Sequence, residues 1–149
     1  MSGRLAQMFR NPDWPQIESL LRRARTIAVV GLSDNPARPS HGVAAGMQRL
    51  GYRIIPVTPT ATSVLGERCV PDLHHLGEVL APGEHVDIVD VFRRPEHVAP
   101  IVAECIALQL PALWLQDGVI DEAAALRAQA AGIFTVMDRC IWRDRAGLR

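Results

Sequence analysis

One stretch decides the fold: Thr26-Ile27-Ala28-Val29-Val30-Gly31-Leu32-Ser33, which continues through residues 34–39 into Ser40-His41-Gly42-Val43. Its apolar, β-branched first half is typical of a strand buried on both faces. Gly31 ends this strand, because a residue without a Cβ allows a sharp turn and a close approach to a ligand. Ser40 is predicted to be the N-cap of a helix that reaches about Leu50. Strand, glycine turn and helix N-terminus together predict a phosphate site, since free N–H groups and the helix dipole both favour an anion.

The composition indicates one domain of ordinary size, with 149 residues of which 48% are hydrophobic. We expect residues 1–12 to be a poorly ordered lead-in and residues 13–149 to form the domain. Basic and acidic residues balance at 16 each, which argues against nucleic-acid or membrane-surface binding driven by bulk charge. Three cysteines without metal-ligand spacing fit a reducing compartment, and no apolar run suits a signal peptide or a membrane span. The sequence therefore predicts a cytoplasmic protein.

Apolar strands and amphipathic helices alternate along the rest of the chain. We predict strands over residues 26–31, 53–57, 86–91, 112–116 and 133–137, and helices over 14–24, 40–50, 96–108 and 122–131. Asp13 and Asp121 are the expected N-caps of two of these helices. Residues 60–66 are expected to be a loop or a short helical turn, residues 70–80 a short surface helix, and the polar tail 138–149 a surface segment. The pattern predicts the α/β class: a single Rossmann-like, doubly wound, five-stranded parallel sheet in the order 3-2-1-4-5, with helices on both faces.

Ligands of such sheets bind outside the carboxyl ends of the strands, at the switch point beside strand one. A dinucleotide is the usual ligand, but the glycine turn lacks the G-x-G-x-x-G pattern. The second strand ends in Val57-Thr58-Pro59-Thr60, without the carboxylate that grips the ribose of NAD. A nucleotide with a phosphate on its ribose tolerates threonine there. Coenzyme A and NADP both meet this description.

In several stretches the chain resembles the small stand-alone CoA-binding proteins, whose domain is similar to the CoA-binding Rossmann domain of the succinyl-CoA synthetase α subunit. The resemblance extends from about Arg25 to Cys140, nearly the whole chain. The matching stretches are residues 27–33 (IAVVGLS), 38–43 (RPSHGV), 51–57 (GYRIIPV), 86–95 (VDIVDVFRRP), 112–119 (ALWLQDGV) and 136–140 (VMDRC).

Position by position, the resemblance implies that Gly31, Leu32 and Ser33 offer backbone and hydroxyl donors to the pyrophosphate of CoA. Arg38 and Ser40 would complete this cradle. The adenosine would lie along Val57 and Thr58. Phe92 would pack against the nucleotide and Arg93 would pair with it. Gln116 and Gly118 would border the pantetheine arm. After its second strand the family usually has Asn-Pro and a basic residue, whereas this chain has Thr58-Pro59-Thr60. The charge would then have to come from Arg38, Arg93 or Arg94.

Other polar residues have structural interpretations. Asp87 and Asp90 face opposite sides of a strand and form no acid–base pair, and Asp90 is expected to hold backbone or an arginine. His74 and His75 are adjacent and lack a third ligand, so we predict no metal site. Cys140 follows a strand end, where a mixed disulfide with CoA is conceivable and an incidental cysteine is the simpler interpretation. We assign no catalytic residue.

The leading hypothesis is a non-catalytic module that binds CoA or an acyl-CoA. The alternatives are an NADP-dependent oxidoreductase, a small CoA-transfer enzyme using His41 or Cys140, and a regulatory protein that senses acyl-CoA through an acyl-CoA enzyme as partner. The exposed edge strands of such a sheet would also allow a homodimer.

Overall fold

The computed structural model describes residues 8–149. Five parallel strands form one sheet: β1 (Thr26–Val30), β2 (Arg53–Val57), β5 (Ile88–Val91), β6 (Ala112–Leu115) and β7 (Phe134–Met137). The helices are α1 (Trp14–Arg23), α2 (Pro39–Arg49), α3 (Val98–Ala107), α4 (Glu122–Ala130) and α5 (Ile141–Ala146). The predicted Rossmann-like α/β class is confirmed.

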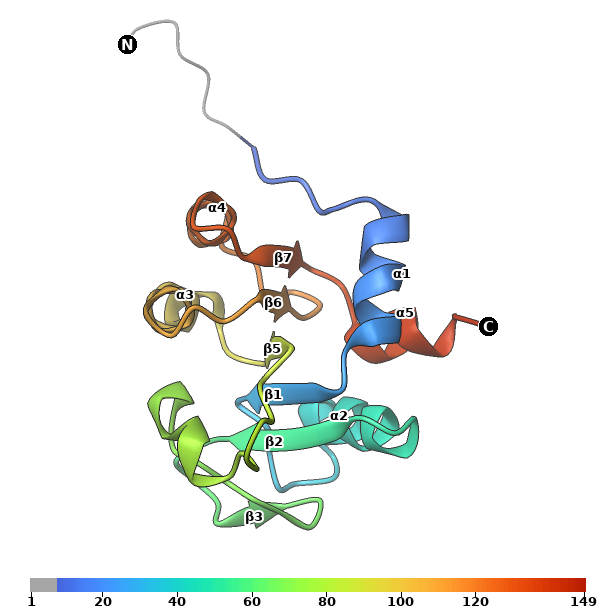
Figure 1. Cartoon of the computed structure of the whole chain (residues 1–149), viewed down its shortest axis with the longest axis vertical. Helices are drawn as coiled ribbons and strands as arrows, with labels where there is room; N and C mark the ends of the chain where they lie inside the picture. The colour runs from blue at the N-terminus through green and yellow to red at the C-terminus, as the bar shows by residue number, and fades with distance from the viewer. Residues whose placement is uncertain (1–7) are drawn as a thin grey trace, which may run out of the picture.

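Helices cover both faces of the sheet, with α1, α2 and α5 on one side and α3 and α4 on the other (Figure 1). Alternate residues of β1 point to these two layers. Ile27 and Val29 join the core under α1, α2 and α5, whereas Ala28 and Val30 join the core under α3 and α4. All five residues of β1 are buried, as its continuous apolar run predicted.

The predicted strand order is wrong. The sheet runs β2-β1-β5-β6-β7, so the third main strand, β5, pairs with β1 and not with β2. The outer edge of β2 is occupied instead by Val70, whose N–H donates to Pro56 O (3.0 Å) and whose carbonyl accepts from Thr58 N (2.8 Å). The switch point therefore lies between β1 and β5.

The connection from β2 to β5 differs from the prediction. Residues 60–66, expected as a loop or helical turn, begin a small antiparallel hairpin of β3 (Ser63–Val64) and β4 (Glu67–Arg68). A 3-10 helix, η1 (Leu73–Glu78), follows where a short surface helix was expected. The hairpin lies beside β2, and η1 packs Leu73 and Leu76 into the core under α3 and α4.

Two helix predictions need correction. Ser40 is not the N-cap of α2, because Arg38 holds that position and Pro39 begins the helix. The tail was expected on the surface, but it forms α5, where Ile141 is fully buried. Asp13 and Asp121 do cap α1 and α4, accepting hydrogen bonds from Gln16 N and Ala124 N. Of the lead-in, residues 1–7 lie outside the described residues, while Asn11 hydrogen-bonds to Met137 at the β7 edge.

Candidate functional site: the crevice at the β1/β5 switch point

A crevice of about 960 Å³ opens at the carboxyl ends of the strands. Most residues that the resemblance singled out line it: Gly31, Ser33, Arg38, Ser40, Thr58, Phe92, Arg93, Gln116 and Gly118. Leu32 and Val57 are buried, at 1% and 3% exposure, and their side chains do not line the crevice. Together with Cys140, which follows β7, these residues show that segments after all five strands meet at one site.

Gly31 is required by the close approach of β1 and β5 at the crevice floor. Its φ is +84°, and a Cβ built there would lie 2.3 Å from the carbonyl oxygen of Phe92 and 2.8 Å from Cδ of Arg93. A side chain would be both strained and in collision with backbone. The Arg93 stem thus crosses directly over the glycine turn.

The donors of the predicted phosphate cradle are partly engaged by the protein itself. Gly31 N–H donates to Val57 O (2.9 Å), and Ser33 N–H donates to the Ser40 hydroxyl (3.0 Å). The Ser40 hydroxyl, which was expected to cap α2, therefore accepts a hydrogen bond from the loop before the helix. Among residues 8–149, the N–H of Leu32 donates to no protein group. At the start of α2, Pro39 has no N–H and the His41 N–H donates to Arg38 O (3.1 Å). The open donors among the described residues of this loop are thus the N–H groups of Leu32 and Ser40.

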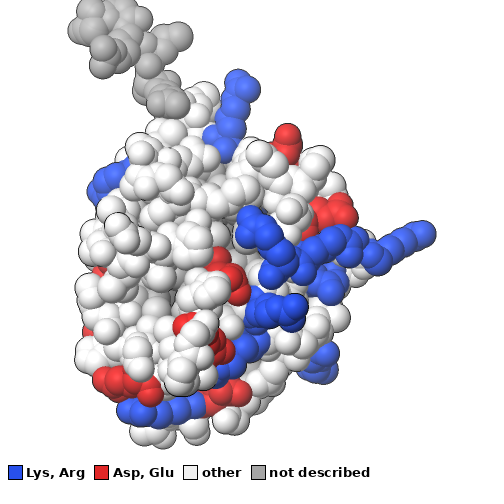
Figure 2. Space-filling model, in the orientation of Figure 1, with Lys and Arg blue, Asp and Glu red and all other residues white. Residues whose placement is uncertain are grey.

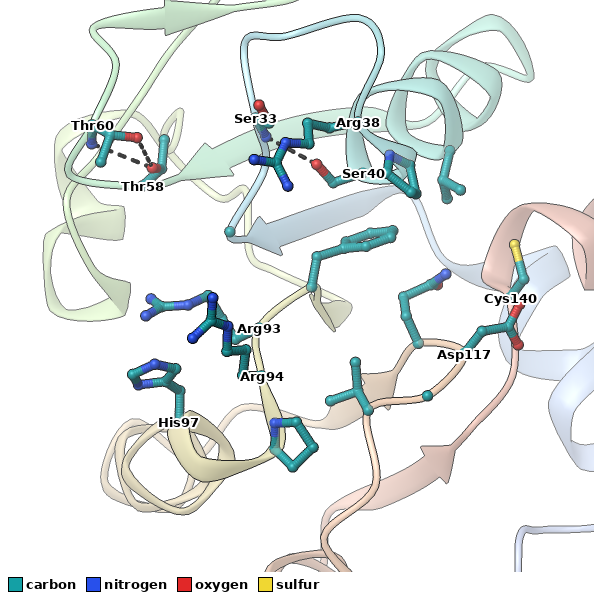
Figure 3. A pocket seen from close by; sticks show the side chains of 18 of the residues that line it. Ser33, Arg38, Ser40, Thr58, Thr60, Arg93, Arg94, His97, Asp117 and Cys140 are labelled. Carbon is teal, nitrogen blue, oxygen red and sulfur yellow. Dashed lines mark hydrogen bonds between the residues drawn. The ribbon is translucent and has the colours of Figure 1, made fainter.

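One half of the crevice is basic. Arg38 comes from the start of α2, and Arg93, Arg94 and His97 come from the segment between β5 and α3; all four border the crevice (Figure 3). In the part of the chain that the structure describes, no ion pair involves any of these three arginines. Three cations without an acidic partner at one ligand-sized site are suited to a polyanion.

Thr58 forms the opposite wall of this basic half, beyond the end of β2. It is 6% exposed, and its hydroxyl is 2.9 Å from that of Thr60 and accepts from Thr60 N (3.3 Å). The hydroxyl pair stabilises the loop, and neither residue brings a charge. Arg93 and Arg94 line the crevice across from this loop (Figure 3).

The other half is neutral or apolar and is built on α5. The carbonyl oxygen of the Gln116 side chain accepts from Ile141 N (3.0 Å), and Gly118 N donates to Asp138 Oδ1 (2.8 Å). Asp117 is paired with Arg143 at 2.9 Å. These contacts hold the ends of β6 and β7 together, and they bring Cys140 to the crevice wall (Figure 3).

Asp87 and Asp90 lie in different surroundings, and neither lines the crevice. Asp87 lies at the other end of the strands, where its carboxylate accepts from Arg25 N (2.8 Å) and Thr26 N (3.0 Å). Asp90 is 1% exposed, and its Oδ1 has no hydrogen-bond partner among the described residues, so the expectation that it holds backbone or an arginine is wrong. Burial raises the pKa of Asp90 well above its ordinary value.

His74 and His75, the adjacent histidines considered as metal ligands, lie outside the crevice. His75 Nδ1 is 2.7 Å from Asp72 Oδ1, which raises the pKa of His75, and His74 is 3.5 Å from Glu104. Within residues 8–149, no group of three or more His, Cys, Asp or Glu side chains is arranged to hold a metal ion. None of the described helices is long and apolar enough to span a membrane.

Several lining residues were not assigned from the sequence, among them Val43, Pro95, His97 and Val119. Val43 is the fifth residue of α2, and His97 ends the short 3-10 turn Pro95–His97 that leads into α3. The signal for them was positional, because the start of a helix after a strand-end loop faces the same end of the sheet. Their residue types alone carried no such signal.

Three comparisons with known proteins bear on this crevice. A sequence family described as "CoA binding domain" matches residues 25–145. The uncharacterized protein YneT of Bacillus subtilis strain 168 is 41% identical over 133 residues, which cover 89% of this chain and 94% of YneT.

Among solved structures, a protein from Thermus thermophilus, cell-free ID.343, superposes with a TM-score of 0.82 at 34% identity, covering 91% of this chain and 98% of its own. The dinucleotide-forming acetyl-coenzyme A synthetase 1 of Ca. Korarchaeum cryptofilum superposes with a TM-score of 0.63 at 18% identity over 78% of this chain and 27% of its own. At 18% identity, the similarity to the synthetase is one of fold alone.

Proposed function

This chain belongs to the CoA-binding domain family, and from that membership we propose that its crevice binds coenzyme A, or an acyl-CoA, without carrying out chemistry on it. One observation carries the proposal: the crevice has a basic half with three arginines that form no ion pair within residues 8–149, and a neutral half without them. CoA has the same division, with phosphates on its nucleotide and an uncharged pantetheine arm.

The residues present fit a ligand of this size and charge. The crevice volume of about 960 Å³ is near the top of the usual range for small-molecule sites, roughly 300–1,000 Å³. The pyrophosphate would accept from the Leu32 N–H and from the start of α2, with Arg38 beside it. Arg93 and Arg94 would pair with the ribose phosphate, and the adenosine would lie along Thr58 and Phe92.

A non-catalytic role is supported by the spacing of the reactive side chains. A nucleophile and its base must lie within hydrogen-bond reach of each other. His97 and Cys140 lie on opposite sides of the crevice (Figure 3), and the carboxylate of Asp117 is held by Arg143. The module would then serve by binding, either alone or with an acyl-CoA enzyme as its partner in the cytoplasm.

The test is a calorimetric titration of the protein with CoA, dephospho-CoA and NADP. CoA is expected to bind in the micromolar range, and dephospho-CoA at least about ten-fold more weakly, because a charge-assisted contact to the ribose phosphate is lost. Binding of NADP without binding of CoA would overturn the proposal and favour the oxidoreductase alternative.

A further inference from the structure

Cys140 is buried but lies outside the two large hydrophobic clusters. Its exposure is 9%, yet it belongs to neither of the two hydrophobic clusters that fill the layers between sheet and helices. It lies instead in the wall of the crevice. Cys140 thus borders the ligand space, while the two clusters pack without it.

Gln116 is a second polar group directed at the same end of the crevice. Its side chain is 3% exposed, and its Oε1 is held by Ile141 N (3.0 Å), which fixes the orientation of the amide. The Nε2 group donates to no protein atom among residues 8–149, and the residue lines the crevice. A buried amide N–H₂ left open toward a cavity is a donor for a ligand carbonyl, and the pantetheine arm carries two amide carbonyls.

The two halves of the crevice give the arm a direction. Phosphates are favoured at Arg93 and Arg94, and Cys140 lies across the crevice from them (Figure 3). The far end of CoA from its nucleotide is a thiol. A ligand bound with its phosphates on the arginines therefore extends its sulfur toward Gln116 and Cys140.

We propose that Cys140 is a modification site, which forms a mixed disulfide with CoA by exchange with a disulfide of CoA; this inference rests on the proposed function. The Cys140 thiol loses its proton, and its sulfur attacks the CoA sulfur of the disulfide. The new bond joins Cys140 to CoA, the original S–S bond breaks, and the departing thiolate takes up a proton. The incoming disulfide is the oxidant.

The other two cysteines are controls within the same chain. Cys105 is completely buried in the core under α3 and α4, where burial raises the pKa of its thiol to about 12. Cys69 lies by the β3–β4 hairpin and does not line the crevice, and burial also raises its pKa. Only Cys140 combines access to the ligand with a position at the uncharged end.

The experiment is intact-mass spectrometry of the reduced protein after treatment with CoA disulfide, beside Cys140→Ser, Cys69→Ser and Cys105→Ser. One CoA is expected to add to wild type, Cys69→Ser and Cys105→Ser, to be removed by dithiothreitol, and not to add to Cys140→Ser. Serine suits the N-cap of α5, where Cys140 makes no side-chain hydrogen bond, so this variant is expected to fold. Bound ligand reaches an effective concentration in the millimolar range, so at about 0.1 mM disulfide the reaction is expected to be roughly ten-fold faster than with cystamine.

The outcomes separate this inference from the proposed function. Cys140→Ser cannot form the disulfide, so its titration with reduced CoA tests binding alone. If CoA binds normally, three results would overturn the role of Cys140 alone. They are no added mass, modification at Cys69, and equal rates for CoA disulfide and cystamine. Failure of Cys140→Ser and wild type to bind CoA overturns both.

Discussion

At the scale of single residues, the crevice depends on how Arg93 lies over Gly31. The 2.8 Å separation between Arg93 Cδ and a Cβ built on Gly31 means that the arginine stem occupies the space that a side chain would take. This packing fixes the direction of the guanidinium, which no acidic residue of the described chain neutralises through an ion pair. Arg93 is therefore the residue that we expect to contribute most to phosphate binding.

Arg93→Ala is expected to weaken CoA binding about ten-fold or more, because a charge-assisted hydrogen bond is worth about 1.5–3 kcal/mol. Titration calorimetry measures the effect, and thermal unfolding checks that the variant is folded. Arg49→Ala is the matched control, since Arg49 is exposed at the end of α2 and outside the crevice. Equal dissociation constants for the two variants would remove Arg93 from the site.

Gly31 and Gly42 offer a second matched pair. Gly31→Ala is expected to lower the free energy of unfolding by more than about 2 kcal/mol, since it combines positive φ with a collision against Phe92 O. Gly42→Ala meets nothing within 4 Å and lies in α2, so it is expected to raise that free energy by about 0.5 kcal/mol. Denaturant unfolding measures both. A neutral Gly31→Ala would contradict the close approach of the two strands.

At the scale of elements, α5 is the support of the neutral half of the crevice. It is held by Ile141, which is buried under the sheet, and by Trp142, which lies against Gly46 of α2. A Cβ at position 46 would lie 2.2 Å from Trp142 Nε1. The glycine in the middle of α2 is therefore explained by the packing of α5 and not by its own backbone angle.

This packing predicts a coupled pair of substitutions. Gly46→Ala is expected to cost about 1–3 kcal/mol in the wild-type background, because Trp142 must move. In a Trp142→Ala background the same change is expected to stabilise the protein by about 0.5–1 kcal/mol through helix propensity. A double-mutant cycle of unfolding free energies measures the coupling. Additive effects would show that α2 and α5 do not meet at this point.

Elements and lining residues were predictable from the sequence to different degrees. The apolar run of β1 and the capping residues Asp13 and Asp121 act locally, so the periodicity predicted them correctly. Strand order depends on which edge a returning strand takes, and no local pattern records that Val70 occupies the β2 edge. Ser40 has the sequence signature of a cap, but a contact with Ser33 engages its hydroxyl. Tertiary contacts decided both cases.

At the scale of the whole molecule, the charge is balanced but unevenly spread. Figure 2 shows basic side chains gathered on the side of α1 and α5, whose last turns carry Arg22, Arg23, Arg143 and Arg145. With a formal net charge of zero, the molecule has no strong overall field, so attraction of an anionic ligand depends on the local crevice arginines. The sheet edges are partly covered by Asn11 and Val70, which a dimer formed edge to edge would have to displace.

The stability of the whole fold is expected to depend on pH through Asp90. The raised pKa means that the folded state holds a proton that the unfolded chain releases above about pH 4. The free energy of unfolding contributed by this group therefore falls as the pH rises. Asp90→Asn, which has the shape of the protonated acid, is expected to raise the Tm at pH 8 by at least about 2 °C. Thermal unfolding from pH 4 to 8 should show this gain shrinking toward pH 4. A gain that is constant with pH would contradict burial of an ionisable carboxyl.

The central claim, that CoA lies in the crevice between the ends of β1 and β5 with its nucleotide at the arginines, is tested most directly by backbone amide shifts during a CoA titration. The claim predicts the largest shifts at Leu32, Arg93 and Gln116, and none at Arg25 or Gly83, which border a smaller groove at the opposite strand ends. Shifts centred on Arg25 and Gly83, with Leu32 and Arg93 unmoved, would contradict it.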